Sequence, residues 1–177
     1  MRIETERLVL RPFVDDDASE VLDIHSRLDV IRWLGTQPPI PMATHEEALA
    51  WIDGWRTMEG GPYDVGLAIE VRGTGVSVGA VMIIPLPHAE HDERQIGWQV
   101  HPDVAGRGYA TEAARAMLDQ VFASGLDEVW CDMFADNVPS AKVAERLGLT
   151  PLGMVPDPWY EGESRLFHMT SEEWLSR

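Results

Sequence analysis

The sequence is poor in cysteine and in positive charge, and it has no long apolar run. Its 177 residues include a single cysteine, Cys131, which excludes an internal disulfide framework. Cys131 stands in an apolar run typical of a buried strand, so we expect a core residue rather than a reactive thiol. No apolar stretch is long enough to span a bilayer, and the charged N-terminus lacks a signal-peptide pattern. These absences favour a cytoplasmic protein without a membrane partner.

Positive charge is scarce relative to negative charge. Lysine and arginine total 14 against 30 aspartates and glutamates, for a formal net charge of −16. Such an excess argues against nucleic acid as a partner and suits cationic partners such as amines or basic peptides. A solvated acidic surface that only confers solubility explains the same charge. The hydrophobic content of 45% suffices for a packed core, and the length favours one domain over residues 1–177.

Apolar periodicity and turn residues predict a mixed α/β chain with antiparallel meanders. Helices are expected from Asp15, over 29–34, from Thr44 to about Met58, and from 110 and 140 onward. Thr44 and Glu47 form a capping box for the third of these helices. The expected strands cover residues 4–11, 63–71, 76–86, 93–100, 128–134, 150–155 and 164–169.

A glycine-rich turn stands between a strand-like run, Ile96–Val100, and an amphipathic run that starts at Ala110. Gly106 and Gly108 lack a Cβ, so backbone N–H groups there can approach a ligand closely. The helix that follows adds unpaired N–H groups and the positive end of its dipole. The pattern predicts a phosphate-binding turn. An ATP site is disfavoured, because the turn lacks a Gly-Lys-Ser/Thr ending.

Residues 106–113 resemble the acetyl-CoA pyrophosphate loop of the GNAT N-acetyltransferases. Residues 4–11 are similar to the opening of the RimJ/RimL-like branch, which is ribosomal-protein-alanine N-acetyltransferase-like and acetylates protein N-terminal amines. Residues 96–102 resemble the fourth strand of that branch, and 137–149 resemble its second signature. The resemblance covers the whole chain. It implies a GNAT-like α/β (α+β) fold, with a central mixed, mostly antiparallel sheet of about seven strands and flanking helices.

The resemblance also implies an activity. We expect an acetyl-CoA-dependent N-acetyltransferase that moves an acetyl group to a primary amine, of a protein N-terminus or a small molecule, by direct attack in a ternary complex. No metal is expected, and the histidines of the 88–91 loop are more typical of an ordinary polar loop. The alternative is a catalytically weak or silent acyl-CoA-binding or sensor module. A tryptophan-rich region near Trp51 would support a homodimer, although core packing explains it as well.

Acetyl-CoA, as co-substrate, is expected to contact the turn and the elements beside it. Asn137 would bind the pantetheine arm and Ser140 would donate a hydrogen bond to the leaving thiolate, although helix capping explains both residues too. Ala105 stands where the family often has Gln or Arg, at the loss of one side-chain contact. The expected cofactor-binding residues are Trp98, Val100, Ala105, Gly106, Arg107, Gly108, Tyr109, Ala110, Thr111, Asn137, Ser140 and Lys142.

The general base is less clear from the sequence. Many relatives have a Glu two residues before the strand glycine, but this chain has Gln95, which cannot accept a proton at neutral pH. Period-two counting puts Glu93 on the same strand face, so we expect Glu93 as the base, with a water chain as the alternative. Ser140 and Glu93 are therefore the expected catalytic residues. The expected acceptor-binding residues are Trp33, Trp159, Tyr160 and Glu161.

Overall fold

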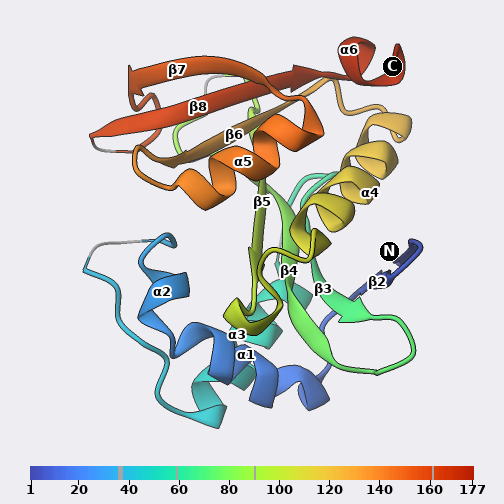
Figure 1. Cartoon of the computed structure of the whole chain (residues 1–177), viewed down its shortest axis with the longest axis vertical. Helices are drawn as coiled ribbons and strands as arrows, with labels where there is room; N and C mark the ends of the chain where they lie inside the picture. Colours follow the sequence, from blue (N-terminus) through green and yellow to red (C-terminus); the bar gives the residue numbers. More distant parts are fainter. Residues whose placement is uncertain (36–37, 59, 90, 161) are drawn as a thin grey trace.

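One mixed sheet of eight strands organises the protein, in the order β1-β2-β3-β4-β5-β6-β8-β7 (Figure 1). This computed structural model describes residues 1–35, 38–58, 60–89, 91–160 and 162–177. Neighbouring strands are antiparallel except β5 and β6, which are parallel. The strands are β1 (Ile3–Glu4), β2 (Leu8–Arg11), β3 (Val65–Val71), β4 (Ser77–Pro85), β5 (Arg94–Val100), β6 (Glu128–Phe134), β7 (Thr150–Pro156) and β8 (Glu163–Thr170).

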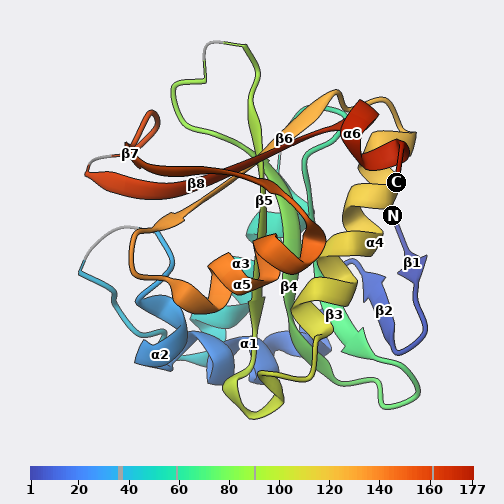
Figure 2. The same cartoon turned by 45° about the horizontal axis from the view of Figure 1, so that its top comes forward.

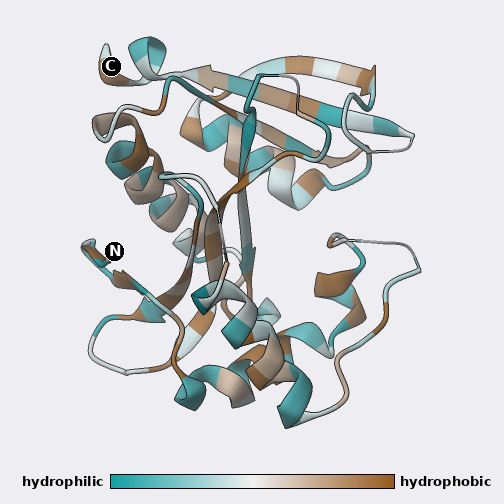
Figure 3. Cartoon of the chain, turned by 180° about the vertical axis from the view of Figure 1, so that it is seen from behind, coloured by the Kyte–Doolittle hydropathy of each residue, from teal (hydrophilic) through white to brown (hydrophobic). Residues whose placement is uncertain are grey.

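Helices cover both faces of the sheet (Figures 1 and 2). On one face α4 and α5 pack against the larger apolar cluster, and on the other α1 and α3 pack against a smaller one. Figure 3 shows hydrophobic segments concentrated in the central strands, while the helices carry both hydrophilic and hydrophobic residues. No helix of the described ranges is long and apolar enough to cross a bilayer. The helices are α1 (Ala18–His25), α2 (Leu28–Ile31), α3 (His45–Arg56), α4 (Tyr109–Ala123), α5 (Val138–Leu147) and α6 (Ser171–Leu175).

The first predicted strand is wrong in one respect, because residues 4–11 form two strands. Thr5 makes the turn between them: its N–H donates to the carbonyl of Leu8 at 3.0 Å, and its Oγ1 accepts from Leu8 N at 2.9 Å. β1 therefore folds back on β2, and the sheet has eight strands rather than about seven. α6 was not expected either, although Thr170 and Glu173 form a capping box at its start. The other expected elements match to within a few residues.

The parallel pair β5–β6 is joined by a single hydrogen-bonded residue pair. β5 pairs with β4 along its whole length, from Arg94 to Val100, but its register with β6 consists of Gln95 opposite Trp130. Beyond this bridge the two strands separate, and Figure 1 shows β6 crossing above while β5 runs downward. Alternate N–H and C=O groups of β5 then face a gap rather than a neighbouring strand. We call this opening the β5–β6 gap.

Candidate functional site

The glycine turn leads directly into α4 beside the β5–β6 gap. Gly106 and Gly108 have φ values of 77° and 82°, a backbone region that favours glycine. Gly108 caps α4, and the first helical bond runs from Glu112 N to its carbonyl at 3.0 Å. Within the described part of the chain, the N–H groups of Tyr109, Ala110 and Thr111 have no backbone acceptor. The turn therefore presents free donors at the positive end of a helix, which suits a phosphate group.

Among the side chains at the turn, a hydroxyl rather than a cation is placed to contact a bound phosphate. Thr111 Oγ1 is buried and has no hydrogen-bond partner among the described residues, so it is a polar atom suited to a ligand oxygen. The Arg107 guanidinium instead turns back to the carbonyl of Asp103 at 3.3 Å and is exposed. Lys142 is exposed on α5. The residues present fit a pyrophosphate held mainly by backbone N–H groups and Thr111.

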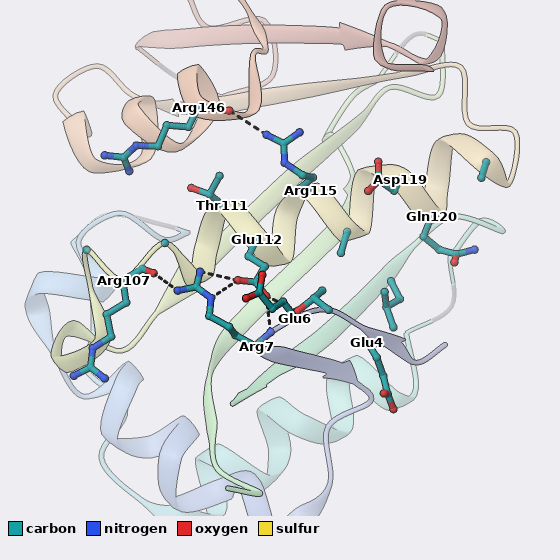
Figure 4. A pocket seen from close by; sticks show the side chains of 16 residues that line it. Glu4, Glu6, Arg7, Arg107, Thr111, Glu112, Arg115, Asp119, Gln120 and Arg146 are labelled. Carbon is teal, nitrogen blue, oxygen red and sulfur yellow. Dashed lines mark hydrogen bonds and ion pairs between the residues drawn. The ribbon is translucent and has the colours of Figure 1, made fainter. Parts of the chain in front are cut away.

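The N-terminal hairpin braces the turn from outside (Figure 4). Glu112 accepts hydrogen bonds from Thr5 Oγ1 at 2.6 Å, Arg7 N at 2.9 Å and Arg7 Nε at 2.7 Å. Arg7 Nη1 also donates to the carbonyl of Arg107 at 2.9 Å. Burial would raise the pKa of Glu112, but the hydrogen bonds from Thr5 and Arg7 outweigh it and lower the pKa. Sequence reasoning assigned no role to Arg7 or Glu112, because they lie 105 positions apart.

Asn137 and Ser140 lie just beyond β6, at the start of α5. Asn137 is buried, and its Oδ1 accepts from Ser140 N at 3.2 Å, so it caps α5. The capping interpretation is therefore correct for Asn137. Its amide nitrogen has no hydrogen-bond partner within the described ranges and is available to another acceptor. Both residues follow the end of β6 in the chain, beyond the residues that bridge to β5.

Aromatic residues cover the other face of the sheet at the bridge. Gln95 Nε2 donates to the hydroxyl of Tyr160 at 3.2 Å, and the rings of Trp130 and Trp159 are 5.3 Å apart. The predicted acceptor residues Trp159 and Tyr160 therefore do come together with Gln95. Burial raises the pKa of Tyr160, so this hydroxyl stays protonated.

Two further acceptor residues were predicted. Trp33 follows α2, and its ring is 6.3 Å from that of Phe134, the last residue of β6. Phe134 is on the same face of β6 as Trp130 by strand alternation, so Trp33 also borders that face. Glu161 lies outside the described residues.

The structure does not bring Glu93 to this group. Glu93 precedes β5, and its carboxylate accepts from the N–H of His91 at 2.8 Å, a bond that lowers the pKa of the carboxyl. Glu93 lies one residue before β5, which begins at Arg94, and its carboxylate turns back to His91 instead of joining Gln95. A carboxylate of lowered pKa that is turned toward its own loop does not support Glu93 as the base.

Asp132 lies near this group and was not predicted from the sequence. It lies in β6 between buried Cys131 and Met133, and it shares the face of Trp130 by strand alternation. Burial raises the pKa of Asp132 to about 6; hydrogen bonding with Ser164 opposes the rise and the charge of Asp157 adds to it. A carboxylate between two apolar residues of a predicted strand was the sequence feature that could have indicated Asp132.

Comparison with known proteins gives the family. The model of the acetyltransferase (GNAT) domain matches residues 7–150. The chain belongs to the GNAT family. This GNAT protein is accordingly an N-acetyltransferase, and acetyl-CoA is the acetyl donor of its family.

Two relatives from Bacillus subtilis carry the same general name. The uncharacterized N-acetyltransferase YnaD is 26% identical over 98% of this GNAT chain and 99% of its own length. The uncharacterized N-acetyltransferase YoaA is 25% identical over 90% of this chain and 88% of its own.

Solved structures share the fold. A GNAT-family acetyltransferase from Bacillus anthracis is 24% identical, covers 98% of this GNAT chain and 100% of its own, and has a TM-score of 0.80. The microcin C7 self-immunity acetyltransferase MccE, solved in complex with acetyl-CoA and AMP, is 16% identical over 94% of this chain and 93% of its own, with a TM-score of 0.77.

The brace on the glycine turn leads to a first prediction for this GNAT protein. Arg7→Ala removes the charge-assisted bonds to Glu112 and the bond to the Arg107 carbonyl, so the turn loses part of its preorganisation. We expect CoA affinity to fall by about 10-fold, the value of roughly one such hydrogen bond. Isothermal titration with CoA measures the change. Arg2→Ala is the control, because Arg2 contacts exposed Glu4 on the same hairpin; equal affinity losses in the two variants would contradict a specific brace.

Proposed function

We propose that the chain is a single-domain enzyme over residues 1–177. It transfers the acetyl group of acetyl-CoA to a primary amine, by direct attack in a ternary complex. The observation that carries the proposal is the β5–β6 gap, which opens beside a turn with free N–H donors. The gap offers strand-like backbone groups to an extended ligand, while the turn offers an anion site next to it. A ligand with an amide-bearing arm and a pyrophosphate matches both.

Each element of the gap would hold one part of this co-substrate. The N–H groups at the start of α4 and the hydroxyl of Thr111 would bind the pyrophosphate. The backbone from Trp98 to Val100 would bind the amides of the arm, and Asn137 would supply its free amide nitrogen. When bound, acetyl-CoA supplies an activated thioester, so the protein has to position the amine, accept its proton and stabilise the leaving sulfur.

The chemistry needs no covalent enzyme intermediate. The amine nitrogen forms a bond to the thioester carbon, the carbon–sulfur bond breaks, and the amine loses one proton while the sulfur gains one. We assign to Ser140 the hydrogen bond that stabilises the sulfur as it leaves. Its hydroxyl makes no hydrogen bond within the described residues, so it is available for a ligand.

The acceptor that fits best is a cationic primary amine, of a protein N-terminus or a small molecule. Aromatic side chains and the carboxylates of Asp132 and Asp157 border the acceptor face, and the chain carries a net charge of −16. Such a surface attracts cations. A Vibrio cholerae protein with the provisional name ribosomal-protein-serine acetyltransferase shares the fold, with a TM-score of 0.77 and 23% identity over 96% of this chain and 97% of its own. This likeness supports a RimJ/RimL-like acceptor, a protein N-terminus.

The activity is tested by incubating the protein with acetyl-CoA and amines while free thiol is monitored. The panel contains peptides with N-terminal alanine or serine, spermidine and an aminoglycoside, and mass spectrometry identifies the acetylated product. We expect thiol release that depends on one of these amines. Tight CoA binding without amine-dependent thiol release from any of them would favour a silent acyl-CoA-binding module instead.

Ser140→Ala tests the assignment of the leaving-group hydrogen bond. We expect kcat to fall by about 10- to 100-fold while CoA affinity changes little, because the lost interaction strengthens only as charge develops on sulfur. Steady-state kinetics and CoA titration separate the two effects. Ser124→Ala is the control, since Ser124 also lies at a helix end but bonds the carbonyl of Gln120 at 2.8 Å on α4. An unchanged kcat in Ser140→Ala would leave Ser140 as part of the helix start alone.

A further inference from the structure

Asp132 stands on the acceptor face, at the mouth of the β5–β6 gap. The bridge puts Gln95 opposite Trp130, and Asp132 is the next residue of β6 on that face. Its position is therefore one step into the region where the strands separate. Tyr160 lies beside both residues, since its hydroxyl accepts from Gln95 and its pKa is raised in part by the charge of Asp132. Asp132, Gln95 and Tyr160 thus form one group at the bridge.

The neighbours of Asp132 favour a carboxylate that binds a proton readily. The residue is half-buried, and its Oδ1 is buried without a hydrogen-bond partner in the described part of the chain. A buried carboxylate oxygen without a donor makes the charged form costly. A second carboxylate, Asp157, lies close enough to disfavour ionisation further.

The other groups near Asp132 do not offset this effect with a positive charge. From the β7–β8 loop come Asp157 and Tyr160, and from β8 comes the hydroxyl of Ser164, which donates to Asp157 Oδ2. Farther along the same face, His168 bonds Glu128 at 2.9 Å. Arg165 pairs with Met133, the neighbour of Asp132 that faces the opposite side, and donates to the carbonyl of Ala135 at 3.2 Å.

Both oxygens of Asp157 already accept hydrogen bonds from the protein, so Asp132 is the carboxylate of the pair that can accept a proton. Oδ1 of Asp157 accepts from the N–H groups of Trp159 and Tyr160, both at 2.8 Å, and its Oδ2 accepts from Ser164. These three donors hold the Asp157 carboxylate in place. Asp157 therefore orients the aromatic loop while its charge keeps Asp132 ready to accept a proton. Gln95 and protonated Tyr160 cannot serve as the base.

We propose that Asp132 is the general base that takes the proton from the acceptor amine, and that Asp157 is its positioning residue. The inference rests on the proposed acetyl transfer. The acceptor amine, cationic in solution, first loses one proton to solvent and attacks as the neutral amine. As its nitrogen bonds to the acetyl carbon, an N–H bond breaks and this second proton passes to the Asp132 carboxylate. The carbon–sulfur electron pair leaves with the sulfur, which is then protonated, so one amine proton and one thiol proton balance. Asp132 returns to its ionised form by losing its proton to solvent.

The test is the pH–rate profile of Asp132→Asn with acetyl-CoA and the best amine of the panel above. Because the base must be ionised, the wild-type rate is expected to rise with pH through about 6. Asp132→Asn is expected to lower kcat/KM by at least 100-fold at pH 7 and to lack that limb. Asp157→Asn should move the limb to lower pH, since it removes the neighbouring negative charge.

Controls separate a base from a structural carboxylate. The affinity for CoA should be the same in Asp132→Asn as in the wild type. Asp127→Asn removes an equal charge at an exposed position just before β6 and should leave the profile unchanged. In Asp132→Ala, added formate should restore part of the rate by supplying a carboxylate. A structural role would show no rescue.

The outcomes also distinguish this inference from the proposed function. If the wild type acetylates an amine and Asp132→Asn retains the acidic limb and most of its rate, Asp132 is not the base while the acetyl transfer stands. If the wild type acetylates no amine of the panel, the proposed function fails and the role of Asp132 fails with it. If Asp132→Asn is slow but keeps the wild-type pH dependence and shows no formate rescue in the alanine variant, Asp132 is structural.

Discussion

Gly108→Val is expected to weaken CoA binding by about 100-fold or more, the largest effect on the co-substrate site. Gly108 has a φ of 82°, where a β-branched residue is strongly disfavoured. Relief of that strain requires the backbone to rotate, which turns the N–H groups at the start of α4 away from the gap. An added Cβ would also stand 3.4 Å from Arg7 Nη2, against the guanidinium that braces the turn. Isothermal titration with CoA measures the loss.

Gly75→Val is the matched control for this variant. Gly75 has a φ of 72° in the β3–β4 hairpin, and an added Cβ there meets no atom within 4 Å. It imposes the same kind of backbone strain far from the turn. Both variants should lose thermal stability to a similar extent, but only Gly108→Val should lose CoA. CoA affinity that survives in Gly108→Val would contradict the assignment of the turn as the phosphate site.

Asp64→Asn is expected to reduce the free energy of unfolding by about 3 kcal/mol, because it leaves a buried guanidinium without its main partner. Arg94 begins β5, and its side chain is 5% exposed while that of Asp64 is 3% exposed. Arg94 Nε donates to Asp64 Oδ1 at 2.7 Å. The pair thus fixes the start of β5, one residue before the Gln95–Trp130 bridge. Denaturant unfolding followed by tryptophan fluorescence measures the change.

Asp92→Asn provides the comparison, since Asp92 contacts the same guanidinium from solvent. Its carboxylate lies 2.7 Å from Arg94 Nη1 and is 78% exposed. Exposed ion pairs contribute about 0–1 kcal/mol, so this variant should unfold near the wild type. Asparagine also tolerates the positive φ of this position. Equal losses of unfolding free energy in the two variants would mean that burial does not determine how much the ion pair stabilises the protein.

The features that the sequence predicted are local ones. The glycine turn, the capping box at Thr44 and the helix start at Asn137 depend on residues a few positions apart, and the structure places all three as expected. The GNAT resemblance supplied the family, which the family model confirms.

The features that could not be predicted from the sequence depend on how distant segments come together. The contact between Gln95 and Tyr160 requires the β7–β8 loop to fold across the β5–β6 bridge, and no pattern within either segment indicates that. Asp132 gains its importance only from this arrangement. Glu93 was assigned by extending strand alternation one residue beyond the start of β5, where the carboxylate turns back to His91.

The single bridge between β5 and β6 has a thermodynamic consequence. Strands β1–β5 form one hydrogen-bonded part of the sheet and strands β6–β8 another, and among the described residues only Gln95 and Trp130 pair across them. Two such parts can open with different free energies, because each retains its own pairing when the other is lost. A molecule bound in the gap contacts both, and it stabilises the native state in proportion to the logarithm of its concentration over its dissociation constant. If the co-substrate binds in the gap as we propose, its concentration would therefore change how cooperatively the two parts unfold.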